Sequence, residues 1–393
     1  MNIIVDLHIH SKYSMATSKY LDLNNISFWA DKKGIGIIGT GDFTHPHWMN
    51  EIKNMKELDG LLKYKNRSSY FILSVEVNNV FKREDKVYKV HNVILSPSIE
   101  TAEEINEYLS EYGNLLSDGR PTINLDIIDM IVELKRLNKR IEIFPAHIWT
   151  PWYSILGSRY GFETIKNALG KVSTKILAIE TGLSSDPIMN WMISEIRELP
   201  IISNSDAHGL RSIGREATVL NIKELTYSGV IEAIKEKRIV KTYEYFPQEG
   251  KYYYDGHRKC NVCVNPSEFN KLKGKCPVCG KSMTKGVLHR IYERADKPYG
   301  FKPKDGRDFM YTIPLEQVIA YVRGKSRNAK SVRDEADRMR YVFKGDFNIY
   351  ESDQKKLIAF DRDIGKAIIS IRENKVEWKA GCDGMYGSFK LNY

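Results

Sequence analysis

The sequence predicts an α/β protein in which a barrel of seven strands is followed by two smaller units. Over the first 210 residues, short apolar runs alternate with amphipathic stretches, which is the pattern of parallel strands covered by helices. Four cysteines lie within twenty residues, and basic side chains are in excess in the last third of the chain. At 393 residues the chain is long enough for two or three domains.

Seven apolar runs define the expected strands, and each contains or is followed by a polar or metal-binding residue. They are residues 3–10, 34–42, 70–76, 90–95, 140–147, 175–180 and 199–208. Apolar residues three and four positions apart predict a helix over 127–137, and Asp186-Pro187 marks the start of a helix over 188–199. We therefore expect the barrel to occupy residues 1–245.

The two smaller units follow a change of composition near residues 245–260, where the sequence becomes aromatic and then basic. We expect a zinc-binding module over 246–296 and a basic, mainly helical domain over 297–393. Helical patterns at 315–323, 332–343 and 357–371 precede a strand, a glycine turn and a second strand in that domain.

Charge differs between the two parts of the chain. Residues 1–250 carry 30 basic and 32 acidic side chains, a net charge of −2, whereas residues 251–393 carry 30 and 18, a net charge of +12. A basic half indicates a polyanionic partner, and a solvated lysine-rich surface is the alternative.

The overall composition, 42% hydrophobic and 28% charged, is that of a globular protein. No run approaches the length that spans a bilayer, and the start lacks the pattern of a secretion signal. We therefore expect a cytoplasmic protein.

Histidines and carboxylates gather at the ends of the expected strands. His8 and His10 are two residues apart, so on a strand both side chains leave the same face. Asp206 and His208 repeat that spacing after the last run. The further residues of this kind at or beyond a run's end are Asp42, Glu76, His147 and Glu180.

So many imidazoles and carboxylates at one edge of a barrel would repel or desolvate one another unless cations held them. Mixed histidine and carboxylate ligands suit zinc, manganese or iron. The pattern predicts a multi-metal hydrolytic centre at the edge where barrel enzymes place their catalytic groups. His91 opens its run, so it reaches this edge only if its strand is reversed or its loop folds inward.

Two C-x2-C pairs separated by twelve residues are formed by Cys260, Cys263, Cys276 and Cys279. This spacing predicts a structural zinc site with four thiolates and no open position for water. Basic neighbours such as Arg258 and Lys259 favour contact with DNA phosphates, and a module that only stabilises the fold is the alternative. Cys382 is expected to be a plain residue in the final turn.

Several segments resemble the PHP (polymerase and histidinol phosphatase) superfamily and, more closely, endonuclease Q. They are DLHIHSKYSMATSK, GTGDFTHPHW, NLLSDGRP, PAHIWTPWYSILGSRYGF, AIETGLSSDPIMNW, SDAHGLRSIGREA, EYFPQEGKYYYDGHRKC, CPVCG and CDGMYG. The resemblance covers essentially the whole chain. It implies a distorted (βα)7 PHP barrel, a zinc-binding module and a C-terminal segment that act together on lesion-containing DNA.

The resemblance also implies how the strand-end residues divide among metal ions. The first ion would be held by His8, His10, Glu76 and Asp206. The second would share Glu76 and would also be held by His91 and His147. Asp206 and His147 are the residues expected to be catalytic.

A third ion would use His208 and a ligand that follows the second strand. Many PHP proteins have the sequence T-D-H at that place, whereas this chain has Gly41-Asp42-Phe43. Either Asp42 or His45 then supplies the ligand. His47 is expected to be a partly exposed residue outside the site.

The activity that the resemblance implies is cleavage on the 5′ side of deaminated bases (uracil, hypoxanthine, xanthine) and abasic sites. Two or three zinc, manganese or magnesium ions would activate water and stabilise the leaving oxygen, which suffices to hydrolyse a phosphodiester. The expected products have 3′-hydroxyl and 5′-phosphate ends. A DNA repair endonuclease of this kind would associate with the nucleoid.

Lesion selection requires a pocket that receives a flipped nucleotide and offers a donor and an acceptor to the deaminated base. Trp149, Trp152 and Tyr153 follow His147 and are candidates to wedge or stack against DNA. Packing at the mouth of the barrel is the alternative for each of them.

Gln354, Leu357 and Phe360 loosely match a sliding-clamp binding box, although Asp361 occupies the place of its second aromatic residue. We expect Leu357, Ile358 and Phe360 to pack within a helix instead.

The sequence leaves two other functions open for the whole chain. A PHP phosphoesterase acting on a small phosphorylated metabolite or nucleotide leaves the basic half unexplained, and the full set of ligands argues against a nucleic-acid binder that has lost its metals.

Overall fold

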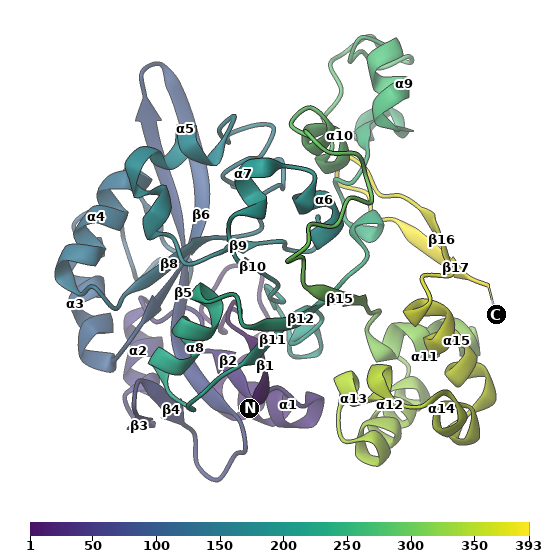
Figure 1. Cartoon of the computed structure of the whole chain (residues 1–393), viewed down its shortest axis with the longest axis horizontal. Coiled ribbons are helices and arrows are strands. Elements are labelled where there is room, and N and C mark those ends of the chain that lie inside the picture. The colour runs from purple at the N-terminus through teal and green to yellow at the C-terminus, as the bar shows by residue number, and fades with distance from the viewer. Residues whose placement is uncertain (393) are drawn as a thin grey trace.

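All seven apolar runs contain a strand in the computed structural model, which describes residues 1–392 (Figure 1). The strands up to residue 245 are β1 (Asn2–Asp6), β2 (Ile37–Gly39), β3 (Lys56–Leu58), β4 (Leu61–Lys63), β5 (Tyr70–Arg83), β6 (Lys86–Ser96), β7 (Thr122–Ile123), β8 (Glu142–Pro145), β9 (Ile179–Glu180), β10 (Ile201–Ile202), β11 (Ala217–Asn221) and β12 (Ile239–Glu244). The sequence pattern missed β3, β4, β7, β11 and β12.

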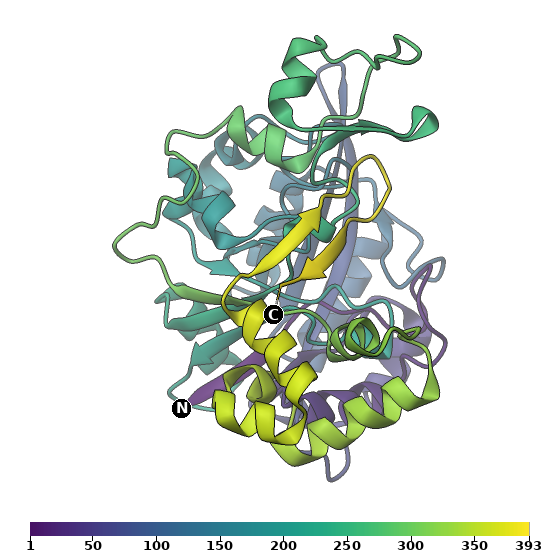
Figure 2. The same ribbon diagram turned by 90° about the vertical axis from the view of Figure 1, so that its right-hand side faces the viewer.

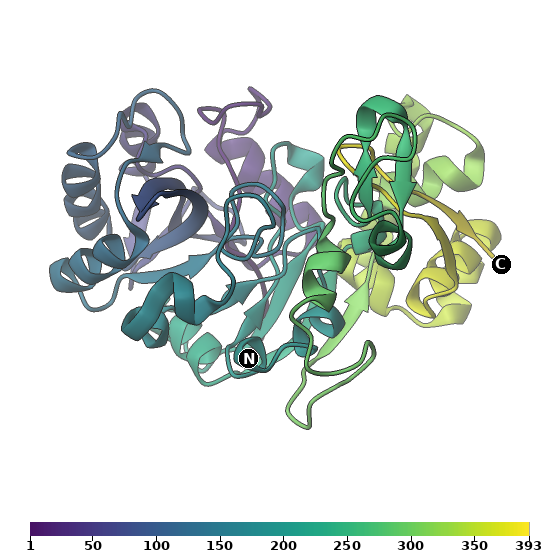
Figure 3. The same cartoon turned by 90° about the horizontal axis from the view of Figure 1, so that it is seen from above.

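The main strands follow one another around a ring (Figure 3). β1 lies between β2 and β11, β2 pairs with β5, and β6 lies between β5 and β8. The separate pair β9–β10 connects β8 to β11, because Leu177 N donates to Ile143 O at 2.8 Å and Ser203 N donates to Thr218 Oγ1 at 2.9 Å. β6 runs antiparallel to both neighbours, which differs from the expected parallel arrangement and brings His91 to the end of the ring where the other candidate ligands lie.

Helices cover the outside of the ring and close one of its two ends. They are α1 (Leu23–Lys33), α2 (Pro46–Ile52), α3 (Ile99–Ser110), α4 (Ile127–Leu137), α5 (Ile165–Leu169), α6 (Pro187–Trp191), α7 (Ser194–Arg197) and α8 (Tyr227–Lys235), with 3-10 turns η1 (Gly170–Lys175) and η2 (Leu210–Ser212). Tyr227 of α8 is buried under the ring, where its hydroxyl donates to Arg140 O at 2.8 Å. The helix expected over 188–199 is divided into α6 and α7, because Ile193 between them is extended.

The remaining elements follow residue 245. They are η3 (Pro247–Glu249), β13 (Asp255–His257), η4 (Arg258–Cys260), β14 (Val262–Val264), α9 (Pro266–Lys271), α10 (Val287–Tyr292), β15 (Asp308–Tyr311), α11 (Leu315–Arg323), α12 (Lys330–Phe343), α13 (Asp346–Glu351), α14 (Gln354–Phe360), α15 (Arg362–Arg372), β16 (Val376–Lys379) and β17 (Ser388–Leu391). None of the helices in residues 1–392 has both the length and the apolar character needed to cross a membrane.

The chain after residue 297 does not form a separate unit throughout. β15 pairs in parallel with β12 and so extends the sheet of the ring. The hairpin β16–β17, yellow in Figure 2, leads back to the module of β13 and β14, where Tyr254 forms a bridge with Cys382. The expected strand, glycine turn and strand at the end of the chain are therefore confirmed, and this hairpin connects the last two units.

Helices α11 to α15 enclose a core of their own. The helix expected over 315–323 is confirmed as α11, whereas the one expected over 357–371 is divided by Asp361 into α14 and α15. The Asp361 side chain caps α15 by accepting from the backbone of Asp363 and Ile364. Leu357 is buried in this core and Phe360 packs against it, as expected, whereas Ile358 is exposed.

A buried guanidinium fixes α12 to its neighbours. Only 1% of the Arg340 side chain is exposed. It donates to both oxygens of Glu316, at 2.8 and 2.9 Å, and to both oxygens of Asp346, at 2.5 and 3.2 Å. Glu316 has its ion pair with Arg340, whereas Asp346 also lies 3.7 Å from Lys33 Nζ.

Replacing Arg340 with methionine should destabilise the protein by about 3–5 kcal/mol, because it leaves the buried carboxylate of Glu316 without its ion-pair partner. The free energy of unfolding in urea measures the effect. The matched control is Arg136→Met, whose ion pair with Glu133 is exposed to solvent, so its loss should leave the stability nearly unchanged. Equal losses in the two variants would contradict this account.

Candidate active site

Two groups of potential metal ligands lie at one end of the ring and share a carboxylate. The first consists of His8, His10, Glu76 and Asp206, and the second consists of Glu76, His91 and His147. Within each group the potential ligand atoms all lie within 4.8 Å of one another. The structure thus brings together the residues that the sequence resemblance assigns to the first two ions.

These residues come from different strands. His8 and His10 follow β1, and Glu76 lies in the middle of β5, fully surrounded by protein. In the antiparallel ladder of β5 and β6, His91 lies opposite Asn78, so its Nδ1 reaches Glu76 Oε1 at 2.8 Å. The reversal of β6 therefore supplies the ligand whose position the sequence left open.

The backbone is strained at three residues of this region. His147, Asp206 and Asp42 have left-handed conformations, with φ angles of 31°, 46° and 50°. Such conformations cost about 1–3 kcal/mol each and are concentrated at functional sites. Gly182 lies directly against His147. A Cβ atom added to Gly182 would be 2.4 Å from the Cβ atom of His147, so position 182 has room only for glycine.

The charges of the site are strongly coupled. Burial alone would raise the pKa of Glu76, but the imidazoles of His91 and His8 and the guanidinium of Arg120 hold this pKa well below its usual range. Burial lowers the pKa of His91 itself to about 4, so His91 is a neutral donor to Glu76 near neutral pH. Burial alone would lower the pKa of His8, but Glu180 and Glu76 outweigh it and raise this pKa well above its usual range. Glu76 is therefore an ionised carboxylate surrounded by cationic or proton-sharing groups.

The donor atoms fit divalent cations. His8 Nε2 is buried without a hydrogen-bond partner, 3.6 Å from Glu76 Oε1 and 3.7 Å from Asp206 Oδ1. A buried polar atom without a partner is costly, and a cation between this nitrogen and the two carboxylates would satisfy all three. Imidazole and carboxylate ligands together suit zinc or manganese.

Glu180 orients the first group without belonging to it. Its carboxylate lies 3.0 Å from His8 Nδ1, and it accepts from His147 N at 2.8 Å and from Asn204 Nδ2 at 2.8 Å. With Nδ1 held in this way, Nε2 of His8 faces the centre of the site. Carboxylates that hold the second nitrogen of a ligand histidine fix its orientation and raise its basicity.

Asp42 has the same role toward His10. Its Oδ1 lies 3.1 Å from His10 Nδ1, while its Oδ2 accepts from Ser11 N at 2.6 Å and from Ser14 Oγ at 2.9 Å. Both oxygens are occupied by hydrogen bonds in a fully buried environment. These contacts orient His10, and they favour a positioning role for Asp42 over the role of ligand to a third ion, for which the sequence left Asp42 and His45 open.

His45 and His208, the other residues expected at a third ion, lie outside both groups. His45 is buried and stacks on Tyr13, with 4.3 Å between the ring centroids. His208 is about one-third exposed, and its Nδ1 lies 3.0 Å from Asp206 O. His47 is exposed at the start of α2, in agreement with the sequence prediction.

Arg120 also contacts the site, and the sequence analysis missed it. Its Nη1 donates to Glu76 Oε2 at 3.1 Å. It lies in a loop two residues before β7, where neither periodicity nor ligand spacing could identify it. The similarity of the segment NLLSDGRP to endonuclease Q is the signal that pointed to this loop.

The three aromatic residues after His147 differ in accessibility. Trp149 is buried and its Nε1 donates to Asn190 Oδ1 at 2.8 Å, so the expectation that it contacts DNA is wrong. Trp152 is partly exposed and lies next to Arg159. Tyr153 is also partly exposed and stacks on His91, with 5.0 Å between the ring centroids. The last two border the mouth of the site.

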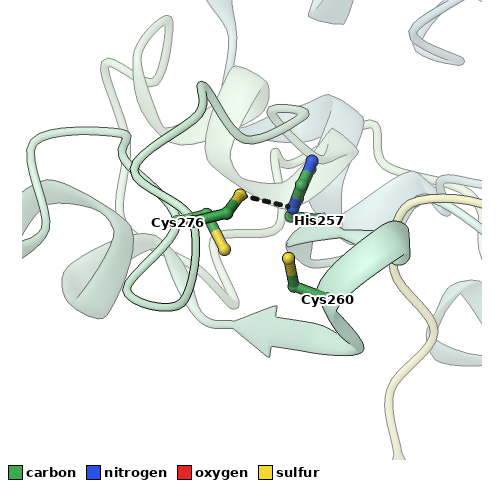
Figure 4. Close-up of side chains that lie close together, drawn as sticks. His257, Cys260 and Cys276 are labelled. Carbon is green, nitrogen blue, oxygen red and sulfur yellow. Dashed lines mark hydrogen bonds between the residues drawn. The ribbon is translucent and has the colours of Figure 1, made fainter.

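A third group of potential ligands lies in the module of β13 and β14, and consists of His257, Cys260, Cys276 and Cys279. Figure 4 shows the side chains of His257, Cys260 and Cys276 pointing toward one another. Burial would raise the pKa of the Cys276 thiol, but backbone hydrogen bonds from Cys279 and Val278 outweigh it and lower this pKa to about 6. A hydrogen bond with Cys279 raises the pKa of the Cys260 thiol to about 11, so Cys276 is the thiol that most readily takes the thiolate form, the form of cysteine that binds metals.

The expected set of four cysteines differs from this group at one position. Cys263 lies opposite Gly256 in the ladder of β13 and β14 and faces the turn between β16 and β17, where it forms a disulfide with Cys382. His257 takes the place of Cys263 among the potential ligands, and Cys382 is not the plain residue expected. Arg258 and Lys259, next to the group, are exposed.

Two further buried carboxylates lie in the ring outside all three groups. The Ser203 hydroxyl lies 3.2 Å from both Glu216 and Glu244. Burial raises the pKa of Glu244 to about 8, and burial together with the charge of Glu244 raises the pKa of Glu216 well above its usual range. This pair therefore holds protons near neutral pH.

The comparisons with known proteins agree with this geometry. Residues 192–239 match the PHP-associated family. The structure is similar to the lesion-specific endonuclease PfuEndoQ from Pyrococcus furiosus, at 32% identity and a TM-score of 0.89, over 100% of this chain and 96% of that chain. It is also similar to endonuclease Q in complex with a 27-mer duplex substrate with an abasic lesion at the active site, at 33% identity and a TM-score of 0.88, over 100% and 97% of the two chains.

Fold and site together define this protein as a hydrolase of the endonuclease class with a PHP-type fold. The chain belongs to the endonuclease Q family.

Relatives in sequence include two uncharacterized proteins. YqxK of Bacillus subtilis is 27% identical over an alignment of 416 positions, which covers 99% of each chain. MJ0043 of Methanocaldococcus jannaschii is 32% identical over 255 residues, which is 62% of this chain and 31% of that protein. The present chain thus spans about a third of the length of MJ0043.

Replacing Glu180 with glutamine should lower metal affinity and catalytic activity by about 10–100-fold, because His8 loses the carboxylate that orients it. Metal content after dialysis against a graded chelator measures the affinity. Glu224→Gln, at an exposed position, is the control and should behave like the parent protein. Unchanged metal retention in Glu180→Gln would show that this carboxylate does not position the histidine.

Replacing Glu244 with glutamine should stabilise the protein at pH 8 by at least about 1 kcal/mol, since one pKa unit corresponds to about 1.4 kcal/mol. A carboxyl group whose pKa is raised in the folded state stabilises it below the unfolded pKa near 4.5, and that contribution disappears as the pH rises through about 8. Urea unfolding at pH 5 and pH 8 measures the difference. If the free energy of unfolding that Glu244→Gln gains over the parent protein is no larger at pH 8 than at pH 5, the pKa of Glu244 is not raised.

Proposed function

We propose that this protein is a metal-dependent DNA repair endonuclease. It hydrolyses the phosphodiester on the 5′ side of deaminated bases (uracil, hypoxanthine and xanthine) and of abasic sites, leaving 3′-hydroxyl and 5′-phosphate ends. The observation that carries the proposal is the pair of ligand groups sharing Glu76, in a chain that matches an endonuclease Q with an abasic duplex over its whole length.

Two divalent ions would be held by the groups that share Glu76. Zinc, manganese or magnesium at these positions would lower the pKa of water and stabilise charge on the leaving oxygen. Glu180 and Asp42 hold the Nδ1 atoms of His8 and His10, so their Nε2 atoms face the ions. A third ion would use His208, whose Nδ1 contacts the backbone and leaves Nε2 for a ligand role.

The second module would hold a structural zinc ion through His257, Cys260, Cys276 and Cys279. Three thiolates and one imidazole complete a tetrahedral set, so this ion would have no open position for water. The proposed division is into a catalytic PHP barrel, a zinc module and a basic C-terminal unit, with the boundaries near residues 245 and 297, and with β15 of the last unit added to the sheet of the barrel.

The zinc module is attached to the loop that follows His147. Arg290 of α10 is buried and donates to Phe162 O at 3.1 Å, and Arg159 donates to Thr284 Oγ1 at 3.1 Å. A module in this position extends the surface next to the site with the exposed Arg258 and Lys259. Together with the net charge of +12 after residue 250, this supports contact with the phosphates of a DNA duplex.

Lesion selection would occur next to His91. Trp152 and Tyr153 are accessible there and present aromatic surfaces on which a flipped nucleotide can stack. Deamination converts an amino donor into a carbonyl acceptor and adds a ring N–H donor, so a pocket with matching groups would reject the normal bases.

Duplexes with a single uracil, hypoxanthine or abasic site should be nicked directly 5′ of the lesion, and a duplex without a lesion should remain intact. End-labelled strands resolved on a denaturing gel measure the cut, and a chelator should abolish it. Asp206→Asn should lose cleavage by at least about 10³-fold while binding the abasic duplex as before, because it loses a metal ligand and not a DNA contact.

Uniform cutting of all duplexes would contradict the proposed specificity, and full activity of Asp206→Asn would contradict the metal site. Turnover of a small phosphomonoester without cleavage of any duplex would instead support a PHP phosphoesterase acting on a metabolite or nucleotide.

A further inference from the structure

Arg120 is held firmly at the mouth of the site. Its loop is fixed on both sides, because Gly119 N donates to Tyr13 O at 3.0 Å and Asn78 N donates to Pro121 O at 3.0 Å. Gly119 also packs against Asp42, where an added Cβ would lie 2.5 Å from the carboxylate. The guanidinium therefore starts from a backbone that cannot withdraw easily from the site.

The guanidinium is only partly used by the protein. Its Nη1 donates to Glu76 Oε2 at 3.1 Å, and this is its single side-chain hydrogen bond to residues 1–392. The side chain remains 23% exposed. Nη2 and Nε thus remain as donors at the accessible edge of the two ligand groups.

A cation in this position conflicts with the ions that the same groups would hold. The carboxylates of the site and its surroundings, Glu76, Asp206, Glu180 and Asp42, contribute four negative charges, whereas two divalent ions and Arg120 would contribute five positive charges, which leaves an excess of one. Like charges a few ångströms apart in a buried site repel strongly. An anion that lies between the ions and the guanidinium removes this conflict, and a phosphodiester is such an anion.

We infer that Arg120 binds a non-bridging oxygen of the scissile phosphodiester and stabilises the negative charge of the phosphoryl group during cleavage. This inference rests on the proposed function and names a further catalytic residue for it. Guanidinium groups pair with phosphate oxygens through parallel hydrogen bonds, and Nη2 and Nε supply two such donors.

The reaction balances without any change in Arg120. The oxygen of water forms a bond to phosphorus, and the bond between phosphorus and the 3′ oxygen breaks, with its electron pair leaving on that oxygen. One proton of the water ends on the 3′ oxygen to give the hydroxyl. The oxygen of the water stays on phosphorus as part of the 5′-phosphate, and the second proton remains on that phosphate or passes to solvent. Arg120 keeps its protons throughout and interacts only with the phosphoryl oxygen.

The first test compares the kinetics of Arg120→Met with those of the parent protein on an abasic duplex at saturating metal. kcat should fall about 10²–10³-fold, the loss typical of removing one donor to a developing anion. KM should change much less, because phosphates along the whole duplex contribute to binding. Arg120→Lys should recover part of kcat, and Arg136→Met, at an exposed position of α4, should match the parent.

The second test separates contact with the phosphate from a structural effect through Glu76. Duplexes with an Rp or an Sp phosphorothioate at the scissile position replace one non-bridging oxygen at a time. If Arg120 binds one of these oxygens, sulfur at that position should slow the parent protein and have a smaller effect on Arg120→Met. Metal content should be equal in the two proteins.

Unchanged kcat in Arg120→Met, equal sulfur effects in both proteins, or loss of the metal ions would each overturn the inference. Chelator-sensitive nicking by the parent protein reports on the proposed function independently. If the parent protein does not nick the abasic duplex, the proposed function fails. If it does nick and Arg120→Met behaves like it, the assignment of Arg120 alone fails.

Discussion

The buried carboxylate of Glu76 is the interaction on which the rest of the site depends. Its two oxygens contact His91 Nδ1 at 2.8 Å, His147 Nε2 at 3.0 Å and Arg120 Nη1 at 3.1 Å. A carboxylate without solvent is tolerated only where cations or hydrogen-bond donors surround it. The fold must therefore bring the end of β1, the reversed strand β6, the residue after β8 and the loop before β7 to one point in the middle of β5.

This constraint explains why the ring is distorted. A ring of uniformly parallel strands would present only residues at strand ends, whereas Glu76 lies within a strand of fourteen residues whose antiparallel partner carries His91. The left-handed backbone of His147 and Asp206 turns their side chains inward as their strands end. Each departure from a regular barrel places one ligand.

The last part of the chain supports the site from outside. Lys33, at the end of α1, donates to Arg211 O and Ile213 O at 2.6 Å and lies 3.7 Å from Asp346 of the helical unit. These carbonyls belong to the loop that follows Asp206. Arg215 in the same loop donates to Ser205 O at 2.8 Å. The helical unit and the site are thus connected through one short loop.

The sequence predicted the elements that depend on local pattern. Helices α4 and α11 have the expected bounds because their apolar residues recur at helical spacing. The resemblance assigned the potential ligands around Glu76 to two ions, and the structure places them in the same two groups. The direction of β6, the pairing of β15 with β12 and the partner of Cys263 were not predictable, because each depends on residues far apart in the sequence. Trp149 is buried because aromatic residues near a site are also used to pack, and Asp42, one of the two candidates for the third ion, contacts His10 Nδ1.

The central claim is that Glu76 is shared by two metal ions in the barrel. Metal content per chain in the parent protein and in Glu76→Gln tests it most directly, with the ion of the zinc module as an internal standard. We expect two or three ions in addition to the module's ion in the parent protein, and loss of at least two of them in Glu76→Gln with the module's ion retained. Full retention of all ions in Glu76→Gln would contradict the shared site.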